Sequence, residues 1–110
     1  MLYDPKWAPP ATEVKIEPWQ KALLDAADLI EKRGWVQCSF HLMGGGYCTL
    51  GAINKVTSGE AGTPSTEGRE AMRHLKAALD ITDIAIWNDH KCESRETVIE
   101  ALRKAADHVV

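Results

Sequence analysis

Four stretches of this chain carry apolar residues at every third or fourth position, which is the period of an α-helix. The expected helices cover residues 18–33, about 47–57, about 65–79 and about 94–108. Pro18, Ser65 and Ser94 suit helix N-termini, and Gly34 suits the end of the first helix. The pattern predicts a mainly α fold, at the margin of α+β, in which four helices pack as in a compact helix bundle.

The segments between and before these helices predict smaller features. Residues 1–17 are rich in proline and lack periodicity, so we expect an extended N-terminal arm before a single helical domain at 18–110. Residues 35–43 mix β-branched and aromatic with polar residues, which predicts a strand of a short hairpin that turns at Gly44–Gly46. The alternation of isoleucines within residues 81–86 permits a short extended piece.

The balance of charge excludes some functions. The 110 residues carry a formal net charge of -3, and acidic and basic residues are interspersed. A nucleic-acid-binding protein usually has a basic face, so we expect no nucleic-acid partner. His74 falls among such charged residues and is expected to face solvent.

The apolar segments and the cysteines indicate a compartment. No segment approaches the roughly 20 apolar residues that cross a bilayer, and the N-terminus does not resemble a signal peptide. Three cysteines are few for a secreted scaffold and favour free thiols in a reducing cytoplasm. We therefore expect a cytoplasmic protein without a membrane partner.

The segment GGGYCTLGAI, residues 44–53, places Cys48 where a helix begins. Unpaired backbone N–H groups at a helix start stabilise a thiolate, so Cys48 is a candidate nucleophile. His41 would then be the base, and Asn88 or Asp89 would orient it. The alternative is a buried cysteine in a close helix contact beside Gly51, and we prefer it because the spacing matches no peptidase signature.

The same cysteine is also a candidate metal ligand. Cys38 and His41 have a Cys-x-x-His spacing, Cys48 follows, and His90 and Cys92 lie in a later irregular segment. Tetrahedral zinc takes four N or S ligands, which makes zinc a possible cofactor. The preferred prediction is that no cofactor is bound, since a domain of this size does not need a metal to fold.

Four tryptophans in a small domain exceed what its core needs, so some are expected at an interface. The candidate partner-binding residues are Tyr3, Trp7, Trp19 and Trp87. For the segment WND at residues 87–89 we prefer a structural role, in which the tryptophan fills the core and an Asx-type turn follows, and an exposed patch for a partner is the alternative.

Four segments, taken in order, resemble a family of small bacterial and phage proteins known only as a domain of unknown function. They are Glu31–Trp35 (ErGW), Cys48–Ala52 (CxxGA), Trp87–Asp89 (WND) and the helix Val98–Ala105, within a match over about residues 20–106. The resemblance implies an intact domain in a bacterial or phage context and brings no activity with it. Cys38 is not a position of this pattern.

Three hypotheses for function follow. The first, which we prefer, is a small intracellular protein-binding module that modulates or inhibits a host protein as a phage or mobile-element accessory factor. It leans towards a protein that is not an enzyme and leaves that question open. The second is a thiol hydrolase or transferase centred on Cys48. The third is a zinc-stabilised structural domain. A homodimer is compatible with each.

Overall fold

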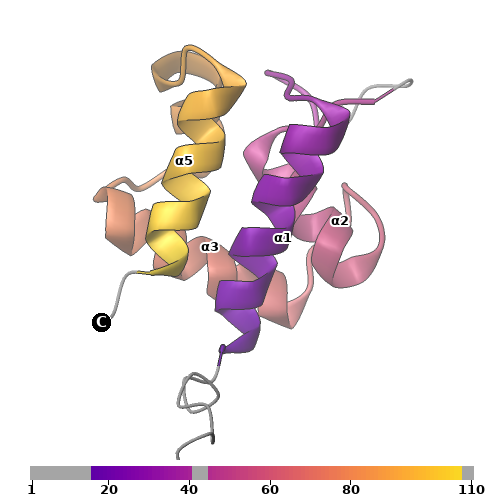
Figure 1. Ribbon diagram of the computed structural model, residues 1–110, viewed down its shortest axis with the longest axis vertical. Coiled ribbons are helices and arrows are strands. Elements are labelled where there is room, and N and C mark those ends of the chain that lie inside the picture. The colour runs from indigo at the N-terminus through magenta and orange to yellow at the C-terminus, as the bar shows by residue number, and fades with distance from the viewer. Residues whose placement is uncertain (1–15, 41–44, 108–110) are drawn as a thin grey trace, which may run out of the picture.

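The computed structural model describes residues 16–40 and 45–107 and confirms a mainly α fold (Figure 1). Tyr3, Trp7 and the predicted arm lie outside the described residues, apart from positions 16 and 17. The elements in chain order are α1 (Pro18–Arg33), α2 (Thr49–Ser58), α3 (Thr66–Leu79), α4 (Ile84–Ile86), η3 (Trp87–Lys91) and α5 (Arg95–Ala106). The four helices expected from the periodicity are therefore present, with bounds within about two residues.

Helix α1 is the centre of the fold and packs against α2, α3 and α5 (Figure 1). At its start, the Gln20 side chain accepts a hydrogen bond from the backbone N–H of Glu17 at 2.8 Å, beside Pro18 in the first turn. At its end, Gly34 has a φ of 103° and donates its N–H to Ile30 O. Most residues avoid this φ, so glycine fixes the point at which the chain leaves the helix.

The core forms around small residues of α1. Ala26 and Ala27 are fully buried, together with Leu23 and Ile30. Three neighbouring helices supply the opposing side chains, which include Ile53, Leu75, Val98, Leu102 and Ala105. Alanine side chains let the helices approach closely, because a close-packed interior leaves little space for larger groups.

Helices α3 and α5 begin as their sequences predict. The hydroxyl of Ser65 accepts from Gly68 N at 3.0 Å, and that of Ser94 accepts from Thr97 N at 3.4 Å. The predicted solvation of His74 on α3 is wrong. Its ring stacks on Trp19 with centroids 3.6 Å apart and planes 4° apart, and its Nε2 lies 3.5 Å from Glu70 Oε2. This stack is a contact between α3 and the first turn of α1.

The predicted hairpin is wrong in the part that the structure describes. Residues 37–40 are bends, and Trp35 forms a single parallel bridge with Tyr47. Val36 N donates to Tyr47 O at 3.2 Å, and Tyr47 N donates to Gly34 O at 3.0 Å. The polar groups of this segment are satisfied by other elements, as described below, so no partner strand is needed.

The predicted extended piece at residues 81–86 is also wrong. Asp83 accepts a hydrogen bond from Ile86 N at 2.9 Å and starts the single turn α4. The chain then continues into the π-turn η3, in which Cys92 N donates to Trp87 O at 3.1 Å. The isoleucine alternation is too short to specify a strand against this side-chain cap. Pi-turns change the direction of side chains locally and are frequent at functional sites.

Within residues 16–40 and 45–107, every helix is too short or too polar to traverse a lipid bilayer.

We predict that Ala26→Leu destabilises the fold by roughly 1–3 kcal/mol, because the added atoms have no space between α1 and its neighbours. Urea unfolding followed by far-UV circular dichroism measures the change in free energy. The matched control is Ala77→Leu on the exposed side of α3, which should change it by less than about 0.5 kcal/mol. Equal urea midpoints for the two variants would contradict the close packing of α1.

Candidate functional site

One buried carboxamide joins three segments that are distant in sequence. Asn88 in η3 is 1% exposed. Its Oδ1 accepts from Trp35 Nε1 at 2.7 Å, from Thr49 N at 3.0 Å and from Thr49 Oγ1 at 2.7 Å. Its Nδ2 donates to Val36 O at 3.1 Å and to Asp89 Oδ1 at 2.9 Å. The end of α1, the start of α2 and the π-turn are therefore held at one point.

Asp89, the next residue, fixes the segment after α1. Its Oδ1 also accepts from the backbone N–H of Cys38 at 2.8 Å, and Gln37 Nε2 donates to Asp89 O at 2.9 Å. Cys38 has a φ of 62°, a left-handed conformation that is uncommon for a residue with a side chain. The hydrogen bond from its N–H lowers the pKa of Asp89, with a smaller contribution from Asn88 and against a partial burial of the carboxyl group.

The same segment lies directly on the start of α2. Cys48 N donates to Phe40 O at 3.2 Å. A Cβ at Gly51 would lie 2.0 Å from Phe40 O, so no residue but glycine fits without displacing the chain. The backbone of Phe40 thus occupies the space that a side chain at position 51 would fill. This explains why α2 contains a glycine, although glycine lowers the stability of a helix.

These contacts surround a hollow of about 380 Å³. It is lined by Cys38, Ser39, Phe40, Cys48, Leu50, Ala85, Asn88 and Asp89. The apolar walls come from Phe40, Leu50 and Ala85, while the polar groups come from Ser39, the two cysteines and the Asn88–Asp89 pair. The hollow lies within the size range of small-ligand and side-chain pockets, and it is our candidate functional site.

Cys48 is the N-cap of α2, and its Sγ accepts a hydrogen bond from Gly51 N at 3.2 Å. It is only 7% exposed. Burial raises the pKa of this thiol, the N–H groups of Gly51 and Leu50 partly oppose the rise, and the Asp89 charge adds to it. A nucleophilic cysteine is favoured by the opposite direction, so burial acts against the thiolate of the enzyme hypothesis, and the catalytic role of Cys48 stays a prediction. His41, the proposed base, lies outside the described residues.

The other two cysteines proposed as zinc ligands differ in their exposure to solvent. Cys38 is exposed, whereas Cys92 is 5% exposed and belongs to the core. Burial raises the pKa of the Cys92 thiol to about 11. Within the described ranges, no three His, Cys, Asp or Glu side chains are grouped so that they could hold a metal ion. Because His41 is not among them, the zinc hypothesis stays a prediction.

The candidate partner-binding tryptophans of the described chain are half-buried. Trp19 stacks on His74, and both Trp19 and Trp87 pack against the core. Trp87 also accepts a backbone hydrogen bond from Cys92, so its position is fixed by the π-turn. Both residues therefore have structural contacts within the chain, and whether either also binds a partner stays a prediction.

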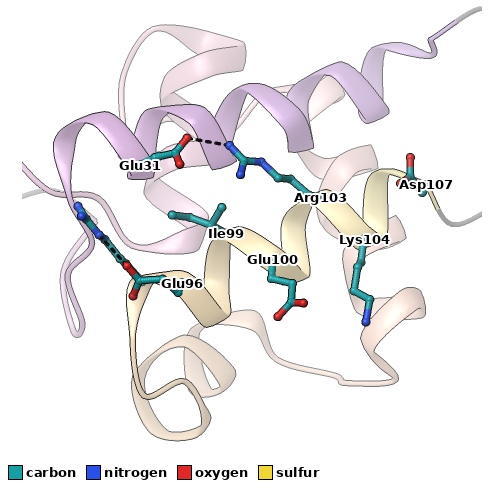
Figure 2. A pocket seen from close by; sticks show the side chains of 8 residues that line it. Glu31, Glu96, Ile99, Glu100, Arg103, Lys104 and Asp107 are labelled. Atoms are coloured by element: carbon teal, nitrogen blue, oxygen red, sulfur yellow. Dashed lines mark hydrogen bonds and ion pairs between the residues drawn. The ribbon is translucent and has the colours of Figure 1, made fainter.

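A second, larger hollow of about 520 Å³ lies along α5 beside the end of α1 (Figure 2). Its lining is mostly charged and of both signs. Figure 2 shows Arg103 reaching from α5 to Glu31 on α1, at 2.9 Å, and the same guanidinium lies 3.0 Å from Asp28. Exposed ion pairs contribute little to stability, so this groove is a solvated contact between two helices.

The sequence prediction missed the apolar side chains of the site. Phe40 and Ile86 are 48% and 53% exposed, and Leu50 and Ala85 line the hollow. One sequence signal was available: a polar Asn–Asp pair directly follows the apolar run IAIW, which indicates polar groups that enter the core. Nothing in the sequence indicated that Trp35 and Thr49 form hydrogen bonds with Asn88.

The fold and the site thus define a small helical domain with a hydrogen-bonded hollow between α2, α4 and the segment that follows α1. The chain belongs to a family of unknown function, DUF6197, whose model matches residues 17–108. This confirms the resemblance to an uncharacterised small-protein family. None of the curated proteins and none of the solved structures with which the chain was compared matches it.

We predict that Asn88→Ala destabilises the protein by about 3 kcal/mol or more, because Trp35 Nε1, Thr49 Oγ1 and Val36 O lose a buried partner. The matched control is Asn54→Ala in α2. Asn54 is buried as well, but its Nδ2 binds Ala61 O at 2.9 Å, and its Oδ1 has no partner among the described residues. Removing it should cost only about 1 kcal/mol. Equal losses of unfolding free energy in the two variants would show that Asn88 does not hold the three segments together.

We predict a fixed order of thiol reactivity in the folded protein at pH 7.5. The exposed Cys38 should react with Ellman's reagent in a fast phase, while the buried Cys48 and Cys92 react at least about tenfold more slowly. The variant Cys38→Ser should lose the fast phase, and all thiols should react alike in urea. A fast phase that survives in Cys38→Ser would contradict this order and support a reactive buried thiol such as Cys48.

Proposed function

We propose that this chain is a small protein-binding module that docks a partner protein at the hollow and at the apolar side chains beside it. The observation that carries the proposal is the exposure of Phe40 and Ile86. They are two of the three large apolar residues that are exposed in the described ranges, the third being Ile16. Phe40 lines the hollow, and Ile86 follows Ala85, which also lines it.

An exposed phenylalanine that lines a hollow, with an exposed isoleucine next in the chain to a lining residue, favours a protein partner. Burial of a phenylalanine or isoleucine side chain stabilises a complex by about 1.5–3 kcal/mol relative to exposure in water. Large apolar side chains beside a concave site are typical of interaction surfaces, and those that fill pockets at the centre of an interface contribute most to affinity.

The order of the site supports the same function. The backbone of residues 38–40 is held by Asp89, by Cys48 N and by close contact with Gly51. A segment that is already ordered loses little conformational entropy when it binds, and this lowers the cost of association. The surface is therefore prepared for binding before a partner arrives.

The proposal extends the earlier hypothesis of a module that modulates a host protein. It places the docking surface at Phe40 and Ile86, whereas Trp19 and Trp87 have contacts within the domain. Tyr3 and Trp7 lie outside the described residues and stay candidate contacts. The bacterial and phage context that the resemblance implies makes a bacterial host protein the partner that we would look for first.

The test compares the double variant Phe40→Ser, Ile86→Ser with the wild-type protein. Each is immobilised and used to capture proteins from a lysate of the organism that carries the gene. A captured protein is then purified, and its affinity is measured by isothermal titration calorimetry. We expect the double variant to bind at least about tenfold more weakly, because two apolar contacts are lost.

Ile16→Ser is the matched control, because Ile16 is 59% exposed and lies before the start of α1, whereas the hollow lies beyond its end. It should bind as the wild type does. Equal affinities for the double variant and the wild type, or no purified protein that binds, would contradict the proposal. Self-association that the double variant abolishes would make a second copy of the chain the partner.

A further inference from the structure

The hollow offers a single charge to a ligand. Of its lining residues in the described part of the chain, only Asp89 has an ionised side chain at neutral pH. The N–H of Cys38 and the amide of Asn88 both donate to its Oδ1, at 2.8 and 2.9 Å, and they lower the pKa of the carboxyl group. Asp89 is therefore a fixed negative charge at a defined place.

The other polar groups of the hollow are engaged within the protein. The oxygen of the Asn88 carboxamide accepts from Trp35 and Thr49, and its nitrogen donates to Val36 and Asp89. The Cys48 thiol is held neutral by burial, and its Sγ accepts from Gly51 N. A ligand in this hollow thus meets one carboxylate beside apolar walls.

From this charge pattern we infer that the partner inserts a peptide segment in which an apolar side chain stands beside an arginine. The apolar side chain packs between Phe40, Leu50 and Ala85, and the guanidinium binds the Asp89 carboxylate. Arginine suits the site better than lysine, because its planar group can bind a carboxylate and also stack on an aromatic ring such as Phe40. The net charge of -3 attracts such a basic segment.

This inference rests on the proposed function and specifies the chemistry of the partner. The test uses capped pentapeptides of the sequence Leu-Leu-Xaa-Leu-Ser, with Arg, Gln or Glu at Xaa. Each is titrated into the ¹⁵N-labelled full-length protein and followed by NMR. We expect the Arg peptide to bind about fivefold more tightly than the Gln peptide, and the Glu peptide to bind most weakly. Shifted amide signals should cluster at Phe40, Leu50 and Ala85.

Asp89→Asn should abolish the preference for the Arg peptide over the Gln peptide. The substitution keeps a side-chain oxygen that can accept from Cys38 N–H, removes the charge and replaces the second oxygen by an NH2 group. The matched control is Glu93→Gln, which removes a charge from an exposed residue outside the hollow and should keep the preference. In the wild type, the preference should fall as salt rises from 20 to 500 mM, as expected for a charge interaction. This salt series needs no variant and decides the question even if Asp89→Asn disturbs the segment.

Three results would overturn the inference. They are equal affinities for the Arg and Gln peptides, shifted signals that lie away from the hollow, and no binding by any peptide at millimolar concentration. If a captured partner nevertheless depends on Phe40 and Ile86, the proposed function stands and only the basic chemistry of the partner is wrong. If the Arg preference is found but no captured protein depends on these residues, the hollow binds basic peptides without the proposed docking surface.

Discussion

The carboxamide of Asn88 holds together the part of this molecule that distinguishes it from a plain helical bundle. A buried amide without partners costs free energy, so its five hydrogen bonds to Trp35, Thr49, Val36 and Asp89 must all form at once. Since the amide is satisfied in only one arrangement, it fixes how the end of α1, the start of α2 and the π-turn meet.

The candidate site depends on these hydrogen bonds of Asn88. The π-turn directs Asn88 into the core and Asp89 towards the segment after α1, where it holds Cys38 in a left-handed conformation. Phe40 then lies on Gly51, with its carbonyl in contact with α2 and its ring partly in solvent. The apolar side chain is thus exposed by hydrogen bonds made elsewhere, which suits a surface that is ready to bind.

Cys48 shows how one position can suggest a chemistry that its surroundings do not favour. A thiol at a helix start is a reasonable candidate for a thiolate, because N–H groups there favour negative charge. Here Gly51 N does donate to the sulfur, yet burial and the nearby Asp89 carboxylate act in the opposite direction and dominate. Cys48 caps α2 through its sulfur, and burial favours the neutral thiol over the thiolate.

The sequence by itself determined the helices, because their period, caps and stops are local properties. Pro18, Gly34, Ser65 and Ser94 act on neighbouring backbone groups, so the bounds of α1, α3 and α5 could be predicted closely. The sequence could not determine the segments at 35–40 and 81–91. Side chains of the second segment bind groups about 40 to 50 positions away, as Asp89 does Cys38 N–H and Asn88 does Trp35 and Thr49, and the short apolar patterns there suggested strands that do not form. Only the tertiary structure decided the hollow. Its walls come from three segments that are distant in sequence and that the hydrogen bonds of Asn88 bring together.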